Sequence, residues 1–271
     1  MRQPAVAGRF YPASPEGLRD AIESCFMDGL GPGLPEGRGS SRRVRGAMVP
    51  HAGYMASGAN AAHVYRRLAE DGGPDAYVII GPDHHGTCAG SVLCSDPFVT
   101  PLGVCGTHEG ICGRLAGSIP DSPDAHAFEH SVEVQVPFIQ YIDPEARIVP
   151  ILMGDQSPAA AERLASCLRE ACEGFDVVFI ASTDLSHYIP KGDAGRLDSM
   201  VLDRVRAMDP DGLYRTVADN RISMCGYGPV MTVMRLCSGC IPEGVLHTDS
   251  NDSLGIDPDS VVGYGSATFV D

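Results

Sequence analysis

The sequence lacks long apolar runs. No stretch of about 18 consecutive apolar residues occurs in the 271 residues, so no membrane-spanning helix is expected. Residues 1–12 also lack the continuous apolar core of a secretory signal. We therefore expect a cytoplasmic protein with no membrane partner.

Long basic runs are missing as well. Thirty-five acidic and twenty basic side chains give a formal net charge of −15, and the basic stretch that stands out is short, at residues 42–45. Phosphate backbones are bound by clustered cations, so we expect no nucleic-acid partner. The acidity indicates a well-solvated surface.

A second C-x-x-C motif is also absent. The ten cysteines are scattered along the chain, and Cys237 and Cys240 alone have this spacing, whereas a zinc ribbon needs two such pairs. We expect most cysteines to be small buried side chains without disulfides, and we favour a structural role for this pair.

The composition that is present is that of a folded protein. Apolar residues make up 44% of the chain and charged residues 20%, as in ordinary globular domains. The length allows one large domain or two small ones, with a core that needs no metal for stability. No internal repeat is visible, and residues 29–41 are predicted to form a surface loop. We expect one domain over residues 1–271.

Strand and helix patterns alternate along the chain. Ser14 and Pro15 are typical of a helix start, and the apolar run at residues 76–80 is typical of a strand buried on both faces. Strands are predicted at residues 44–49, 76–80, 91–94, 148–153, 177–181, 245–248 and 261–269. Further helices are predicted near residues 58–68, 129–142, 158–171, 196–208 and 228–236. This alternation predicts a three-layer α/β/α domain with a central mixed sheet.

Polar side chains follow three of the predicted strands. His51 comes after the first, the adjacent His84 and His85 come after the second, and Asp184 and His187 come after the fifth. Ligands of open α/β sheets bind beyond the carboxyl ends of the strands, so these clusters should converge. Metal binding or acid–base chemistry is the functional interpretation, although each histidine alone has a structural alternative.

Neighbouring side chains in extended backbone point in opposite directions, so one of His84 and His85 should face the site while the other packs. Asp184 could hold the ring of His187 in one tautomer and raise its basicity, as a general base requires. The alternative for Asp184 is that it only caps a turn.

Cys225 lies shortly before the helix that Pro229 is predicted to begin. A helix N-terminus favours the thiolate, which is the form of cysteine that binds metals or attacks substrates. The alternative is a buried structural thiol.

A further cluster leads into the helix predicted at residues 129–142. His126 and His130 have the spacing of a helical metal pair, but Glu129 and Glu133 share that spacing. We therefore take only Glu129 and His130 as residues that line the site.

Six ordered motifs together resemble the Memo family, the B component of the AmmeMemoRadiSam system, over nearly the whole chain. They are residues 7–12 (AGRFYP), 50–54 (PHAGY), 81–85 (GPDHH), 129–133 (EHSVE), 184–187 (DLSH) and 225–226 (CG). The resemblance implies a fold similar to the LigB-like class III extradiol dioxygenases, which are non-haem iron enzymes. It also implies a functional link to a radical-SAM protein and an AMMECR-type protein.

The family's metal ligands fall on His51, His84 and Cys225, with Asp184 and His187 lining the same pocket. A thiolate in place of the dioxygenases' carboxylate favours copper(I), zinc or sulfur-ligated iron, and it argues against ring cleavage.

Three functions follow as hypotheses. The first is a metal-dependent redox enzyme that uses iron or copper, with His187 as acid or base. The second is zinc-assisted hydrolysis in the same cleft, with His187 or Glu129 moving the proton. The third is non-catalytic binding of a peptide or small molecule on a dioxygenase-like scaffold.

Overall fold

The structure is a computed structural model that describes residues 1–37, 39–40 and 42–271. Residues 38 and 41, which belong to the loop predicted at residues 29–41, lie outside the described residues. The rest of that loop contains no helix or strand, as expected.

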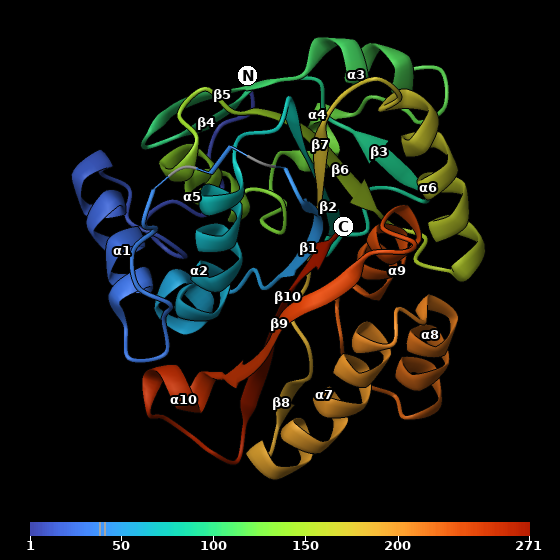
Figure 1. Ribbon diagram of the computed structural model, residues 1–271. Coiled ribbons are helices and arrows are strands. Elements are labelled where there is room, and N and C mark those ends of the chain that lie inside the picture. Colours follow the sequence, from blue (N-terminus) through green and yellow to red (C-terminus); the bar gives the residue numbers. More distant parts are fainter. Residues whose placement is uncertain (38, 41) are drawn as a thin grey trace.

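One mixed sheet runs through the middle of the molecule (Figure 1). Its described strands are β1 (Val44–Val49), β2 (Ala76–Pro82), β3 (Ser91–Leu93), β4 (Phe98–Thr100), β5 (Gly103–Thr107), β6 (Arg147–Met153), β7 (Val177–Ser182), β8 (His187–Ile189), β9 (Ile241–Asp249) and β10 (Val261–Val270). The order is β4-β5-β6-β2-β7-β1-β10-β8, with β3 beside β6 and β9 beside β10. Strands β5, β6, β2, β7 and β1 are parallel neighbours, and β10 is antiparallel to β1.

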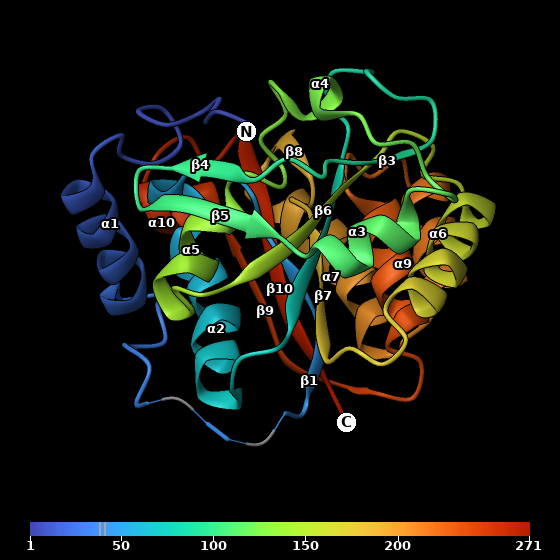
Figure 2. The ribbon, with the colours of Figure 1, turned by 90° about the horizontal axis from the view of Figure 1, so that it is seen from above.

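Helices cover both faces of this sheet, which gives the predicted three layers (Figure 2). The described helices are α1 (Pro15–Met27), α2 (Tyr54–Asp71), α3 (Glu109–Leu115), α4 (Pro123–His126), α5 (Gln135–Ile142), α6 (Pro158–Ala171), α7 (Lys191–Arg206), α8 (Pro210–Asp219), α9 (Tyr227–Leu236) and α10 (Ser250–Leu254). Helices α1, α2 and α5 lie on one face, and α6, α8 and α9 lie on the other. Among the described residues, no helix is both long and apolar enough to cross a membrane.

The sheet has a buried core on each face. Successive strand residues point to opposite faces, so Ile79 packs into one core and Ile80 into the other, as do Ile148 and Val149. This alternation explains why the run at residues 76–80 is apolar without a break. The prediction of a sheet covered on both faces is confirmed.

The helix predicted at residues 129–142 is wrong in its first part, because α5 begins only at Gln135. The carboxylate of Glu129 accepts the backbone N–H of His84, and Glu133 accepts backbone N–H groups of the N-terminal segment. These tertiary hydrogen bonds hold the first six residues in an irregular conformation.

The other predicted elements are present with shifted ends, and the largest shift is in α7, which begins at residue 191 instead of 196. The short elements α3, α4, α8, α10, β4, β5 and β8 were not predicted. All ten cysteines are free thiols and most are buried, as expected.

Candidate metal centre

Three neighbouring parallel strands bring the predicted polar clusters together. Strands β2, β7 and β1 are adjacent, so their carboxyl ends lie at one edge of the sheet. His51, His84 and Asp184 each lie two residues beyond the last residue of their strand, which is 49, 82 and 182, respectively. The convergence inferred from the strand ends is therefore present in the fold.

His51, His84 and Cys225 form a compact set of metal-binding atoms. Each offers one ligand atom, and the three atoms lie within 4.8 Å of one another. The Nε2 of His51 is 3.2 Å from the Sγ of Cys225. His51 is buried, Cys225 is half-buried and the His84 side chain is 29% exposed, so the set opens to solvent on the His84 side.

The loop before α9 holds Cys225 against the end of β7. The N–H of Gly226 donates to the Oγ1 of Thr183 at 2.9 Å, and the N–H of Asp184 donates to the Cys225 sulfur at 3.2 Å. A Cβ at position 226 would lie 2.6 Å from the carbonyl oxygen of Ser182, so only glycine permits this approach.

Cys225 lies directly before α9, as the sequence predicts, but the expected preference for the thiolate is reversed. Burial, followed by the nearby Asp184 carboxylate, raises the pKa of the Cys225 thiol. These effects oppose the thiolate that the helix terminus was expected to favour.

Hydrogen bonds determine which nitrogen of His51 faces the sulfur. The hydroxyl of Ser182 donates to the Ser131 carbonyl at 2.6 Å and accepts from Gln135 at 2.8 Å. The Nδ1 of His51, 2.9 Å from the same hydroxyl oxygen, is therefore the protonated nitrogen. Burial lowers the pKa of His51 well below its usual value, so the neutral ring presents the lone pair of Nε2 to Cys225.

A buried carboxylate orients His84. The Nδ1 of His84 is 2.9 Å from the Oε1 of Glu129, which also accepts the backbone N–H groups of His130 and Ser131, while Oε2 accepts the backbone N–H of His84. Burial opposes the charge of Glu129, but these bonds outweigh it and hold its pKa well below the usual range. Burial likewise opposes the charge of His84, but Glu129 raises its pKa overall. The second nitrogen, Nε2, remains available to a ligand.

His84, Glu129 and His130 form a second set of potential ligand atoms within the same 4.8 Å limit. The rings of His84 and His130 stack with centroids 4.6 Å apart, and burial lowers the pKa of His130 to about 4. This set shares His84 with the first, and Glu129 already accepts hydrogen bonds. We therefore treat Glu129 and His130 as the wall of one centre.

The expected pairing of Asp184 with His187 is wrong. In the part of the chain that the structure describes, the His187 Nδ1 lies 2.9 Å from the Ser223 carbonyl oxygen, whereas Asp184 accepts the His51 backbone N–H at 2.8 Å. The cause is the turn after β7, which directs Asp184 toward β1. Burial raises the pKa of Asp184 to about 6.

His85 points away from the candidate ligands. Its Nε2 lies 3.1 Å from the Phe128 carbonyl oxygen, and its side chain lines a separate cavity of about 350 Å³ together with Arg9 and Thr87. One imidazole of the adjacent pair thus faces the centre, whereas the other, His85, is exposed instead of packed.

Sequence reasoning did not identify the residues that support the ligands. Ser182 stands at the end of a predicted strand, and this position was a usable signal. Gln135 and Ser223 carry no such signal, because one lies at the start of α5 and the other in the loop before α9.

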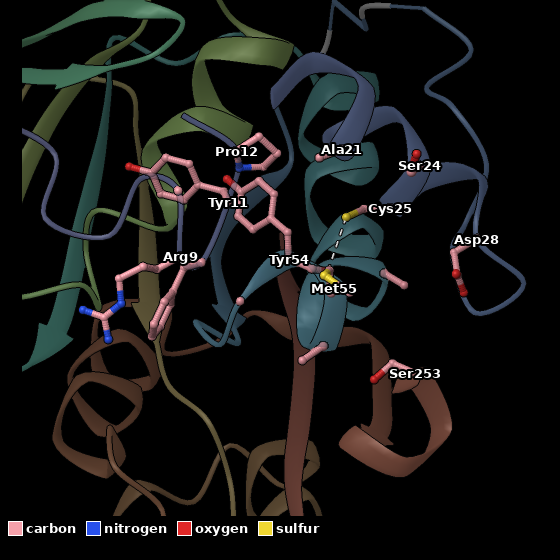
Figure 3. Close-up of a pocket in the computed structure, with 15 residues that line it drawn as sticks. Arg9, Tyr11, Pro12, Ala21, Ser24, Cys25, Asp28, Tyr54, Met55 and Ser253 are labelled. Carbon is pink, nitrogen blue, oxygen red and sulfur yellow. Dashed lines mark hydrogen bonds between the residues drawn. The ribbon is translucent and has the colours of Figure 1, made fainter. Parts of the chain in front are cut away.

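An apolar cavity of about 540 Å³ is lined by the N-terminal segment, α1 and the start of α2 (Figure 3). Its walls include Phe10, Tyr11 and Tyr54, and Arg9 stands at its edge. The ring of Phe10 lies 4.9 Å from that of His130, so Phe10 separates the cavity from the imidazoles. None of the candidate metal ligands is among the described residues that line the cavity.

Comparison with known proteins identifies the family to which the chain belongs. A family profile described as Memo-like protein matches residues 2–268. A MEMO1 family protein of Methanothermobacter thermautotrophicus is 42% identical, covering 97% of this chain and 98% of the relative. Those of Sulfolobus acidocaldarius and Ignicoccus hospitalis are 40% and 42% identical, covering 100% and 99% of this chain and 100% and 98% of the relative, respectively. The chain therefore belongs to the Memo family.

Proposed function

We propose that this protein is a metal-dependent redox enzyme whose metal is held by His51, His84 and Cys225. The observation that carries the proposal is the 3.2 Å distance between the His51 Nε2 and the Cys225 Sγ, with the His84 ligand atom within 4.8 Å of both. A tetrahedral metal with ordinary bond lengths would separate such nitrogen and sulfur atoms by about 3.6 Å. The residues therefore fit a metal after a shift of a few tenths of an ångström.

The donor types favour iron or copper as the redox metal. Two imidazoles and one thiolate form a softer set than two imidazoles and a carboxylate, and they suit copper(I), zinc or sulfur-ligated iron. A bound iron or copper would supply electron transfer to or from a substrate.

The surrounding residues hold the ligands in place. Ser182 fixes the protonated Nδ1 of His51, and Glu129 fixes that of His84. Such outer hydrogen bonds set the orientation and basicity of metal-binding imidazoles. Asp184 ties the His51 backbone to the loop that carries Cys225.

Two groups near the ligands can move protons. The Nδ1 of His187 is hydrogen-bonded to Ser223, which leaves its Nε2 for a substrate. The Asp184 carboxyl, with its pKa raised to about 6 by burial, can hold or release a proton near neutral pH.

The adjacent cavity supports a small molecule as the substrate. Its volume of about 540 Å³ lies within the range of small-ligand sites, and its aromatic wall suits an apolar group. A movement of the Phe10 side chain would join this cavity to the imidazoles.

Zinc-assisted hydrolysis is the second candidate. Three protein ligands that leave a fourth position open are typical of catalytic zinc, and the raised pKa of Asp184 suits a proton-transfer group. The identity of the metal separates the two functions.

The test is metal analysis of protein purified without chelator, together with Cys225→Ala and the control Cys167→Ala, which removes another half-buried thiol. We expect stoichiometric iron or copper in the native protein and the control, and loss of the metal from Cys225→Ala. Tight zinc without redox cycling would favour hydrolysis. If the native protein retained no metal, both proposed enzymatic functions would be contradicted and non-catalytic ligand binding would be favoured.

A further inference from the structure

A pair of thiols lies at the opposite edge of the sheet from the candidate metal centre. Cys237 and Cys240 stand in the turn that joins α9 to β9, beside the amino end of β1. The proposed metal chemistry uses neither residue. Both are free thiols.

The backbone of this turn brings the two cysteines into the range of a disulfide. The N–H of Cys240 donates to the Cys237 carbonyl oxygen at 3.0 Å, and Gly239 has a φ of +97°. A β-turn of this kind holds its first and fourth Cα atoms within about 7 Å. Disulfides join Cα atoms about 4.4–6.8 Å apart, so the turn brings the two cysteines close to this range, and their side chains interact.

The two sulfurs have different surroundings. Cys237 is 2% exposed, and a Cβ at position 46 would lie 2.6 Å from its Sγ, so glycine in β1 provides the space for this sulfur. Cys240 is half-buried, and its Sγ lies 3.4 Å from the Oδ1 of Asp271. Cys240 is therefore the sulfur that an external reagent can reach.

The interaction between the thiols agrees with these roles. It raises the pKa of Cys237 and lowers that of Cys240; burial and the Asp271 carboxylate oppose the Cys240 thiolate, Arg45 favours it, and the pKa of Cys240 is lowered overall. The thiolate is the reactive form in disulfide exchange.

We propose that Cys237 and Cys240 form a redox-active dithiol that exchanges with a small external disulfide. The Cys240 thiolate attacks one sulfur of that disulfide, and the other half leaves as a thiolate. Cys237 then attacks the Cys240 sulfur and its proton passes to the departing sulfur, so the second half leaves as a thiol; the thiolate released first takes a proton from solvent. The protein loses two electrons and gains one disulfide, while the external disulfide becomes two thiols.

The surroundings of Cys240 leave room for a small disulfide. Cys240 lines a surface cavity of about 350 Å³, whose wall combines Arg45, Arg169 and Asp271 with the apolar side chains of Phe175 and Phe179. Because Arg45 pairs with Asp271 and Asp176, this wall carries charges of both signs. Oxidised glutathione is a small disulfide that also carries charges of both signs, and it is a suitable probe.

The experiment exposes reduced protein to graded ratios of oxidised to reduced glutathione, followed by alkylation and peptide mass mapping. We expect a Cys237–Cys240 disulfide, formed at least about tenfold faster than adducts on the half-buried Cys88 and Cys167. In Cys237→Ser a glutathione adduct should accumulate on Cys240, because the resolving thiol is gone. Cys240→Ser should give neither product.

The matched control is Cys172→Ser, which removes a buried cysteine that lines the same cavity. It should form the disulfide as readily as the native protein. Circular dichroism and an unfolding curve for each variant show whether it is folded. Failure to form the disulfide at any ratio, a first adduct on Cys237, or a rate no greater than at Cys88 and Cys167 would overturn the proposal.

Discussion

The two ends of the parallel strands carry different polar chemistry. At the carboxyl ends, neutral His51 and the thiol of Cys225 face each other. The Nδ1 of His51 is hydrogen-bonded to Ser182, and that of His84 is hydrogen-bonded to Glu129. At the amino ends, guanidinium and carboxylate groups pair directly, as Arg42 does with Asp71 and Asp176. The first end gathers three potential ligand atoms within 4.8 Å of one another, whereas the second pairs its charges internally.

The carboxyl ends therefore form a candidate ligand site, whereas the ion pairs at the amino ends stabilise the fold. Asp71, whose side chain is 2% exposed, accepts the backbone N–H groups of Arg43 and Val44 in addition to the Arg42 ion pair. It thereby fastens the end of α2 to the start of β1. Removing a charge at the amino ends should therefore reduce the stability of the fold. Removing a ligand, or a residue that supports a ligand, at the carboxyl ends should reduce metal affinity.

The largest effect is expected for Asp71→Asn. It removes the buried carboxylate that pairs with the half-buried guanidinium of Arg42, which keeps Asp176 as its remaining partner, so the free energy of unfolding should fall by about 3 kcal/mol in urea titrations. Metal content per folded molecule should not change.

The control is Asp176→Asn, because that carboxylate also pairs with Arg42 but its side chain is 35% exposed. An exposed pair contributes less than about 1 kcal/mol. Equal losses in the two variants, or metal loss from folded Asp71→Asn, would contradict the division between the two ends.

A smaller effect is expected for Glu129→Gln, and it concerns metal affinity. The amide still accepts backbone N–H groups but lacks the charge that holds the Nδ1 proton of His84. Loss of such an outer partner typically weakens metal binding about 10–100-fold. Competition titration against a chromophoric chelator measures the change.

Glu70→Gln is the matched control, because Glu70 pairs with Arg66 on α2, away from the candidate ligands. Its metal affinity should equal that of the native protein. An unchanged metal affinity in Glu129→Gln would show that Glu129 does not support the metal ligands.

The sequence was informative wherever strand ends determined the position of a residue. The apolar runs identified β1, β2 and β7, and the carboxyl ends of parallel neighbours had to meet, so His51, His84 and Asp184 were expected together. The three-layer fold followed from the same alternation of strands and helices.

Tertiary hydrogen bonds were what the sequence could not reveal. The helical pattern at residues 129–142 gave no sign that Glu129 and Glu133 would bind the backbone of distant segments. The partner of His187 was misassigned for a similar reason, since Ser223 comes from a loop without periodicity.

The smallest expected effect concerns His126, a buried imidazole that does not belong to the candidate ligand set. His126 shares a helical spacing with His130, yet it is buried beside Phe98, and its Nε2 has no hydrogen-bond partner in the described structure. Burial lowers its pKa to about 4. The unfolded chain, with a histidine pKa near 6.5, therefore binds more protons than the folded protein between these values. Stability must fall as the pH decreases from about 6.5 to about 4.

His126→Gln removes this contribution. Between pH 7.5 and pH 5.5 the native protein should lose about 1 kcal/mol more stability than the variant, as measured by urea unfolding at both pH values. Metal affinity at pH 7.5 should be the same in both, because His126 contributes no ligand atom to the described His51, His84 and Cys225 set. Parallel pH profiles would show that His126 is protonated alike in the folded and unfolded states. Loss of metal from the folded variant would place His126 with the ligands at the carboxyl ends instead of in the structural core.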